Sequence, residues 1–280
     1  MKHNLVLLFS ILISSLIYSQ TEYVEKYDGG QIKVKGFVVD SILTGNYMEY
    51  YKNGQIKSQG ELKNCEYETN HTKIYMASCG VGNNLNIRKG KKHGLWTDYY
   101  ENGVLKSNYN YYCGLRQGNF FYYYESGNLE SIDFYSADKQ MGTQEFHKNG
   151  VLSLTATYSY EYSEHDGHDL KSTMESEYYE DGSLRIQRTV QELKDDVEKE
   201  RFKEYYPNGF LKTETEMVDL DKNGIHREFY ENGNTKYEGI FKDDKPIDKQ
   251  YYYNTKGEIT KIEIWKNGKI ADTELKKTSG

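Results

Sequence analysis

Two short segments of the sequence carry side chains that could bind a metal ion. Asp219, Asp221, Asn223 and Gly224 have the D-x-D-x-N-G spacing that opens a calcium-binding EF-hand loop. The twelfth position of such a loop should be glutamate, and here it is Tyr230. Asp, Asn and Gly are also the residues that turns prefer. We therefore expect a turn at this place rather than a calcium site.

The second segment, Glu164 to Asp169, places two histidines among carboxylates. Imidazole and carboxylate groups together suit a zinc or nickel ion, whereas the alternative is a hydrophilic loop tip. We assign no metal and no cofactor to the chain. The candidate ligands in the two segments are His165, His168, Asp219 and Asp221.

Cysteine chemistry is limited to three residues, Cys65, Cys79 and Cys113, which lack the C-x-x-C spacing of zinc sites. In an oxidising compartment, a disulfide between Cys65 and Cys79 would leave Cys113 unpaired. Buried free thiols are the alternative.

Catalytic motifs are absent from the sequence, which has no G-x-S-x-G elbow, no P-loop and no G-x-G-x-x-G opening a helix. Instead, one carboxylate recurs in most copies of a repeat: Glu25, Glu49, Asp98, Glu145, Glu177, Glu204 and Glu228. A catalytic pair is expected once rather than in every copy. We predict that the chain is not an enzyme and has no catalytic residues.

The elements that must position these residues are β-hairpins. In the segment from Trp96 to Tyr109, Asn102-Gly103 is the dipeptide most typical of a two-residue type I′ turn. That turn predicts the cross-strand pairs Tyr100 with Leu105, Tyr99 with Lys106, and Trp96 with Tyr109.

The hairpin recurs along almost the whole chain, and most turn glycines are 23 or 24 residues apart. The turn glycines are Gly30, Gly54, Gly103, Gly127, Gly150, Gly182, Gly209, Gly233, Gly257 and Gly268. Wider gaps indicate insertions near residues 65–90, with a degenerate copy around Gly80, and near residues 158–172.

Two residue columns should pack against one another across each hairpin. One column lies three residues before the turn glycine: Tyr27, Tyr51, Tyr100, Tyr124, His147, Tyr179, Tyr206 and Tyr230. The other lies two residues after it: Ile32, Ile56, Leu105, Leu129, Leu152, Leu184, Leu211 and Thr235. A second aromatic column, Tyr23, Tyr47, Trp96, Phe120 and Phe202, is expected on the same face. Several of the recurring carboxylates fall between these rings, which the pattern does not explain.

The opposite face should carry another row of rings: Tyr50, Tyr99, Tyr123, Phe146, Tyr178, Tyr205 and Phe229. Their predicted partners are mostly basic: Lys57, Lys106, Glu130, Ser153, Arg185, Lys212 and Lys236. A solvated face with lysine stems over the rings is one interpretation. The other is a ligand-binding strip with cation–π support, for which the candidates are Tyr50, Tyr99, Tyr123, Tyr178, Tyr205, Lys106 and Lys212.

Composition agrees with a sheet that packs through rings, because the 280 residues include 29 tyrosines and only 2 prolines. The expected fold is an all-β, elongated and twisted antiparallel meander of repeated β-hairpins. A net charge of -7 gives no reason to expect nucleic-acid binding. The oligomeric state is open, since exposed terminal strands could pair between chains.

The first 19 residues read as a signal peptide, with Lys2 before an apolar run and a cleavage point near Ser19-Gln20. An uncleaved anchor is the alternative. We expect a secreted or periplasmic protein with no stable membrane span after cleavage, whose residues 20–280 form one repeat array.

The unit Y-Y-x-N-G-x-L-K, followed by G-x-x-x-G-x-W, resembles the MORN-repeat-variant family of bacteria. The resemblance extends from about Tyr23 to Ile270. It implies an array of hairpins that acts as a scaffold or binding surface, with no catalytic residues to carry over. Members are often labelled YwqK-type antitoxin components, whereas this chain begins with an export signal and carries two insertions of its own.

The leading functional hypothesis is an exported, non-enzymatic scaffold that binds a protein or a cell-envelope polysaccharide through its aromatic face. An antitoxin or immunity-type component of a toxin–antitoxin pair is the alternative, which follows from the family label alone. A glycan hydrolase that uses Glu161 or Glu164 of the second insertion is a third hypothesis.

Overall fold

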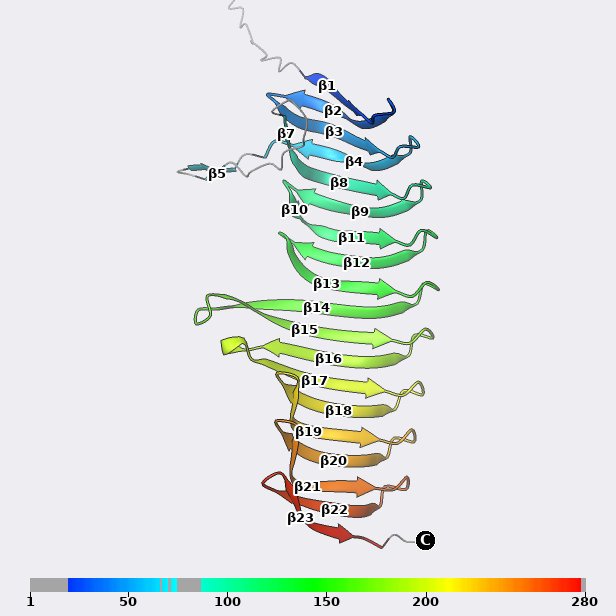
Figure 1. Ribbon diagram of the computed structural model, residues 1–280, viewed down its shortest axis with the longest axis vertical. Coiled ribbons are helices and arrows are strands. Elements are labelled where there is room, and N and C mark those ends of the chain that lie inside the picture. Colours follow the sequence, from blue (N-terminus) through cyan, green and yellow to red (C-terminus); the bar gives the residue numbers. More distant parts are fainter. Residues whose placement is uncertain (1–19, 66, 70–71, 75–86, 278–280) are drawn as a thin grey trace, which may run out of the picture.

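The computed structural model describes residues 20–65, 67–69, 72–74 and 87–277. They form one open sheet of 21 strands and a separate two-stranded sheet of β5 and β6. Successive hairpins stack along the long axis of the molecule (Figure 1). Pairing is antiparallel throughout, apart from a short parallel contact of β7 with β3. The all-β hairpin meander is confirmed, whereas the expected signal peptide and the copy around Gly80 lie outside the described residues.

In the first half of the chain the strands are β1 (Thr21–Lys26), β2 (Ile32–Val39), β3 (Ile42–Tyr50), β4 (Ile56–Lys63), β5 (Tyr67–Thr69), β6 (Thr72–Ile74), β7 (Arg88–Lys89), β8 (Lys91–Tyr99), β9 (Leu105–Tyr112), β10 (Leu115–Arg116), β11 (Gly118–Tyr123), β12 (Leu129–Ser136) and β13 (Lys139–Phe146). The remaining elements are β14 (Leu152–Ser163), β15 (His168–Tyr178), β16 (Leu184–Glu192), the 3₁₀ turn η1 (Lys194–Asp196), β17 (Glu198–Tyr205), β18 (Leu211–Val218), β19 (Asp221–Phe229), β20 (Thr235–Lys242), β21 (Lys245–Tyr253), β22 (Ile259–Lys266) and β23 (Lys269–Leu275). Among the described residues, no helix has the length and apolar character that crossing a membrane requires.

The Asn-Gly turns are not the predicted two-residue type I′ turns. In the β8–β9 hairpin, the amide of Gly103 donates to the carbonyl of Tyr100 at 2.9 Å, and the amide of Tyr100 donates to the carbonyl of Val104 at 2.8 Å. Gly103 has a φ of +84°, whereas Asn102 is not in the positive-φ region. These contacts describe a three-residue loop that ends in a left-handed glycine. The Asn102 side chain favours this loop, because its Oδ1 accepts the amide of Val104 at 2.9 Å.

A β-bulge beside the longer loop shifts the register by one residue, only at the loop end of the hairpin. Trp96 pairs with Tyr109, as predicted, but Tyr99 pairs with Leu105 instead of Lys106. The same irregularity precedes the Asn-Gly or equivalent turn of most other hairpins, for example between Glu204 and Tyr205. A slip of one residue changes which side chains meet across a hairpin. The predicted pairing of the aliphatic column with Tyr100 and its equivalents is therefore wrong.

Two-residue turns with two positive φ values lie along the opposite edge of the sheet, where one hairpin is connected to the next. Asp219 and Leu220, which join β18 to β19, have φ values of +50° and +73°. The carboxylate of Asp219 accepts the amide of Glu198, the first residue of β17, at 2.9 Å. Aspartate tolerates left-handed backbone and can bond to nearby amides, so this turn forms without glycine.

A hydrogen-bonded ladder links each hairpin to the next. The ring three residues before eight of the turn glycines bonds through its hydroxyl, or through Nε2 of His147, to a backbone carbonyl one repeat further along, at 2.7–3.1 Å. The pairs are Tyr27 with Tyr50, Tyr51 with Tyr99, Tyr100 with Tyr123, Tyr124 with Phe146, His147 with Tyr178, Tyr179 with Tyr205, Tyr206 with Phe229, and Tyr230 with Tyr253. We call this set the tyrosine ladder.

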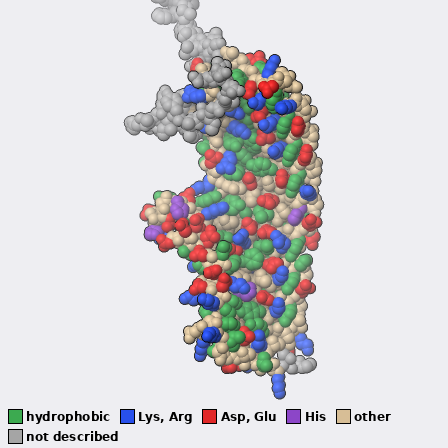
Figure 2. Space-filling model, in the orientation of Figure 1, with side chains coloured by type: hydrophobic (Ala, Val, Ile, Leu, Met, Phe, Trp, Pro, Cys, Tyr) green, Lys and Arg blue, Asp and Glu red, His purple; other side chains and the backbone are tan. Residues whose placement is uncertain are grey.

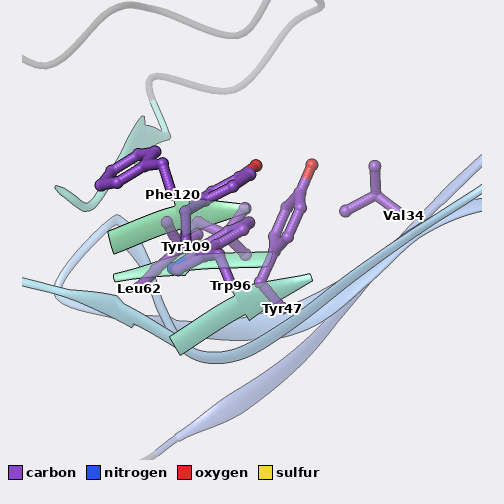
Figure 3. Packing of buried hydrophobic residues seen from close by; sticks show 7 residues of the cluster. Val34, Tyr47, Leu62, Trp96, Tyr109 and Phe120 are labelled. Atoms are coloured by element: carbon purple, nitrogen blue, oxygen red, sulfur yellow. The ribbon is translucent and has the colours of Figure 1, made fainter. Parts of the chain in front are cut away.

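The most buried part of the sheet is an aromatic cluster near its amino-terminal end (Figure 3). Trp96 and Leu62 are 1% exposed and Phe120 is 2% exposed. The indole of Trp96 lies against Gly60, where an added Cβ would be 2.4 Å from a ring atom. Its Nε1 donates to the carbonyl of Glu61 at 3.0 Å. The expected packing role of this aromatic column is confirmed here.

A disulfide joins Cys65 to Cys113 rather than to Cys79. Each cysteine follows the second strand of its hairpin, β4 or β9, so the repeat brings the two together although they are 48 residues apart. Because a cysteine forms one disulfide, the predicted bond between Cys65 and Cys79 is wrong. Cys79 itself lies outside the described residues.

Candidate functional site

A row of half-exposed rings ends the first strand of seven hairpins. It comprises Tyr50, Tyr99, Tyr123, Phe146, Tyr178, Tyr205 and Phe229. We call this row the aromatic strip. Consecutive members lie two strands apart, which is about 9.6 Å at the ordinary strand spacing. Tyr50, Tyr99, Tyr123, Tyr178 and Tyr205 were the candidate ligand-binding tyrosines, and the fold places them in one row.

The tyrosine ladder holds the backbone of the aromatic strip. Every carbonyl of the strip accepts a hydrogen bond from the ladder residue of the preceding hairpin, as Phe146 does from the Tyr124 hydroxyl at 2.9 Å. The two tyrosines that follow one another in each repeat thus have different roles. The side chain of the second bonds to the next hairpin, whereas the backbone carbonyl of the first accepts the bond from the preceding hairpin.

Six of the seven strand partners of the strip are aliphatic, and none is basic. They are Ile56, Leu105, Leu129, Leu152, Leu184, Leu211 and Thr235. The ammonium of Lys106 lies 5.5 Å from the ring centroid of Tyr100, a ladder residue. The ammonium of Lys212 bonds to Glu204 at 2.8 Å. The predicted pairing of Lys106 and Lys212 with Tyr99 and Tyr205 is therefore wrong.

Five of the recurring carboxylates form ion pairs with basic side chains of the same sheet. Lysine or arginine bonds to the acid eight residues before it in the pairs Lys33–Glu25, Lys57–Glu49, Arg185–Glu177, Lys212–Glu204 and Lys236–Glu228. The hydrogen bond that the Lys57 ammonium donates to Glu49 raises the pKa of Lys57. Asp98 differs, because it accepts the hydroxyl of Tyr109 at 2.5 Å. This explains why acids recur between the rings.

One repeat lacks the basic partner and contains a hollow instead. Eight residues after Glu145 the chain has Ser153, and both line a cavity of about 590 Å³ beside Phe146 of the strip. Glu130 and Lys148 also line it. Within the described part of the chain, the side-chain carboxylates of Glu130 and Glu145 have no hydrogen bond or ion pair. In this repeat, no lysine or arginine of the sheet occupies the position eight residues after the acid.

The EF-hand-like segment does not form a calcium loop. Asp219 lies in a turn, and its carboxylate accepts the Glu198 amide. Asp221 begins strand β19, where the carboxylate of Asp244 raises its pKa. Because Asp219 lies in a two-residue turn and Asp221 is already paired with Val218 in the sheet, the segment does not adopt the twelve-residue loop of a calcium site.

The other metal candidates, His165 and His168, lie at the tip of the long β14–β15 hairpin. The tip meets the loop that contains η1, which brings Asp195 to His165, and Glu192 and Asp196 to His168. Sequence reasoning missed these three acids. Only their position one repeat further along could have indicated them.

Four segments of the chain match the model of the MORN repeat variant family, at residues 43–64, 92–111, 116–137 and 222–243. The predicted resemblance to that family is confirmed for these repeats. No curated protein matches the sequence.

Among solved structures, the chain is similar to parts of two much larger ones. They are "Crystal Structure of TcdB2-TccC3 without hypervariable C-terminal region", with a TM-score of 0.20, and "Crystal Structure of TcdB2-TccC3-Cdc42", with a TM-score of 0.16. Both are 11% identical to this chain, of which 89% and 87% is covered. The chain spans only 14% and 18% of their length. Nothing about function follows from likeness at this level.

Proposed function

We propose that the chain is an exported, non-enzymatic repeat scaffold that binds a partner protein through the aromatic strip. The observation that carries this proposal is the row of seven half-exposed rings along one sheet, each with its backbone fixed by the tyrosine ladder. Tyrosine supplies contact area at a low cost in conformational entropy and is enriched among residues that dominate binding energy.

The hollow beside Phe146 supports a protein partner with basic side chains. Five other repeats fill the equivalent position with a lysine or arginine of the chain itself. Where Ser153 replaces that residue, a basic side chain from a partner has both the room and the carboxylates Glu130 and Glu145 to bind. Charge complementarity of this kind adds specificity to the contacts of the rings.

Export is part of the proposal for two reasons. Residues 1–19 have the composition of a signal peptide. The bond between Cys65 and Cys113 is typical of oxidising compartments such as the periplasm or the cell exterior.

The test is cross-linking capture from a cell-envelope extract, with the chain from residue 20 as bait. The variant Tyr99→Ser/Tyr123→Ser/Tyr205→Ser should lose the captured protein and keep the circular dichroism spectrum of the wild type. The matched control is Tyr112→Ser/Tyr162→Ser, which removes two exposed rings outside the strip, 59% and 63% exposed. Equal capture by all three proteins would refute the proposal.

Other partners give different results in the same experiment. Retention on insoluble cell-wall material, with no captured protein, would favour an envelope polysaccharide. Capture of a single toxic protein, and rescue of cells by co-expression, would favour the antitoxin-type alternative. The variant Glu130→Gln/Glu145→Gln distinguishes these outcomes, because only the capture of a partner with basic side chains should depend on those carboxylates.

A further inference from the structure

We propose that the tips of two neighbouring hairpins form a binding site for a divalent transition-metal ion, independent of the aromatic strip. The first tip is the turn between β14 and β15, which carries His165, Asp166 and His168. The second is the loop between β16 and β17, which contains η1. Both reach beyond the edge of the sheet, where histidine and acidic side chains gather on one protrusion (Figure 2).

Two sets of ligand atoms converge between these tips. In the first, His165, Asp166 and Asp195 each offer one atom, and these atoms lie within 4.8 Å of one another. In the second, the same holds for His168, Glu192 and Asp196. Each set therefore combines one imidazole with two carboxylates and draws on both loops.

The distances are close to those of a bound ion. Two ligands of a tetrahedral zinc ion, each about 2.0–2.1 Å from the metal, lie about 3.3 Å from one another. Nε2 of His165 lies 3.1 Å from Oδ1 of Asp195. Their side chains are 59% and 77% exposed, so small rotations can complete the coordination without disturbing a core.

The two loops are already in contact through the backbone. Oδ1 of Asp166 accepts the amide of Asp195 at 3.2 Å, which holds the two tips together. Among the nearby cations, Lys171 lies over the ring of Tyr158 at 4.1 Å and Lys139 bonds to Asp169. Neither ammonium is thus directed at the four carboxylates of the two sets.

Ligand chemistry defines the class of ion. Imidazole suits zinc, copper, iron and nickel, whereas sites for calcium and magnesium consist of oxygen atoms. One histidine with two carboxylates in each set favours Zn²⁺, with water at the remaining position. Bound Zn²⁺ would join the two loops and restrain the tip of the long hairpin.

The experiment is isothermal titration of the chain from residue 20 with ZnCl₂ at pH 7.5, after treatment with EDTA and with the disulfide intact. We expect at least one Zn²⁺ per chain, with a rise in melting temperature that EDTA reverses. The variant His165→Gln/His168→Gln should lower the affinity at least tenfold. The control Glu164→Gln, which changes an acid of the same turn outside both sets, should bind as the wild type does.

A second readout locates the ion. Zn²⁺ should slow amide exchange in residues 163–168 and 193–197 of the wild type but not of the double variant. Absence of Zn²⁺ binding by the wild type would overturn the proposal. Undiminished binding by the double variant would also overturn it.

Discussion

The hydroxyl of Tyr206 donates a hydrogen bond to the backbone carbonyl of Phe229 at 2.9 Å, 23 residues further along the chain. This contact joins the turn end of one hairpin to the last residue of a strand in the next. Its repetition along the sheet makes each hairpin dependent on its neighbours, as in other repeat arrays.

The variant Tyr206→Phe should therefore lower the free energy of unfolding by about 1 kcal/mol, because it removes the donor of a half-buried hydrogen bond and leaves the ring in place. Urea denaturation followed by circular dichroism measures the loss. The matched control is Tyr205→Phe, whose hydroxyl donates an exposed hydrogen bond to Oε1 of Gln187 at 3.2 Å. Equal effects of the two substitutions would contradict a ladder that stabilises the array.

Gly60→Ala should destabilise the amino-terminal cluster by roughly 1–3 kcal/mol, because the added methyl group would overlap the buried ring of Trp96. Urea denaturation monitored by tryptophan fluorescence should show both the loss and a red-shifted native spectrum. Gly29→Ala is the control, since the atoms near its added methyl belong to the flexible side chain of Gln31. An unchanged midpoint for Gly60→Ala would argue against this packing.

Reduction of the bond between Cys65 and Cys113 should lower the stability of the region between these residues. A bond that closes a 48-residue loop is worth about 4 kcal/mol in the chain-entropy model. Cys113→Ser should lower the melting temperature as a reducing agent does, whereas Cys79→Ser should leave it unchanged. Peptide mapping without reductant should recover Cys65 linked to Cys113; a peptide linking Cys65 to Cys79 would disprove this pairing.

Acidification should destabilise the protein through His226, which is 7% exposed and bonds to the hydroxyl of Thr215 at 2.8 Å. Burial lowers the pKa of His226 below the ordinary 6.5, with a further lowering from Lys222 and an opposing effect of Glu228. The folded state thus binds a proton less readily than the unfolded state. The contribution of this group is present above pH 6.5 and is lost as the pH falls through the lowered pKa.

His226→Phe keeps a ring against Phe241 and removes the titrating group. Its free energy of unfolding should decrease less than that of the wild type between pH 6.5 and 5, as measured by urea denaturation at several pH values. Thr215→Val, which removes the hydrogen-bond partner and keeps the histidine, should retain the wild-type dependence on pH. The same slope for His226→Phe and the wild type would show that other groups cause the acid sensitivity.

The turn chemistry shows where prediction from sequence ended. Asn102-Gly103 predicts a hairpin, and the hairpin is present. The loop has three residues rather than two, because the Asn102 side chain bonds to the amide of Val104 and leaves only the glycine left-handed. That one residue decides that Tyr99, rather than Tyr100, pairs with Leu105. The face assignment of the lysines failed for the same reason.

By itself the sequence determined the all-β class, the hairpin period and the burial of rings such as Trp96, because these follow from local turn signals and from alternation along a strand. Only the tertiary structure decided the disulfide partner of Cys65, the acceptor of each tyrosine hydroxyl and the meeting of His165 with Asp195. Each of these contacts joins residues 22–48 positions apart. They depend on how one hairpin is placed against the next, and local sequence patterns do not specify that placement.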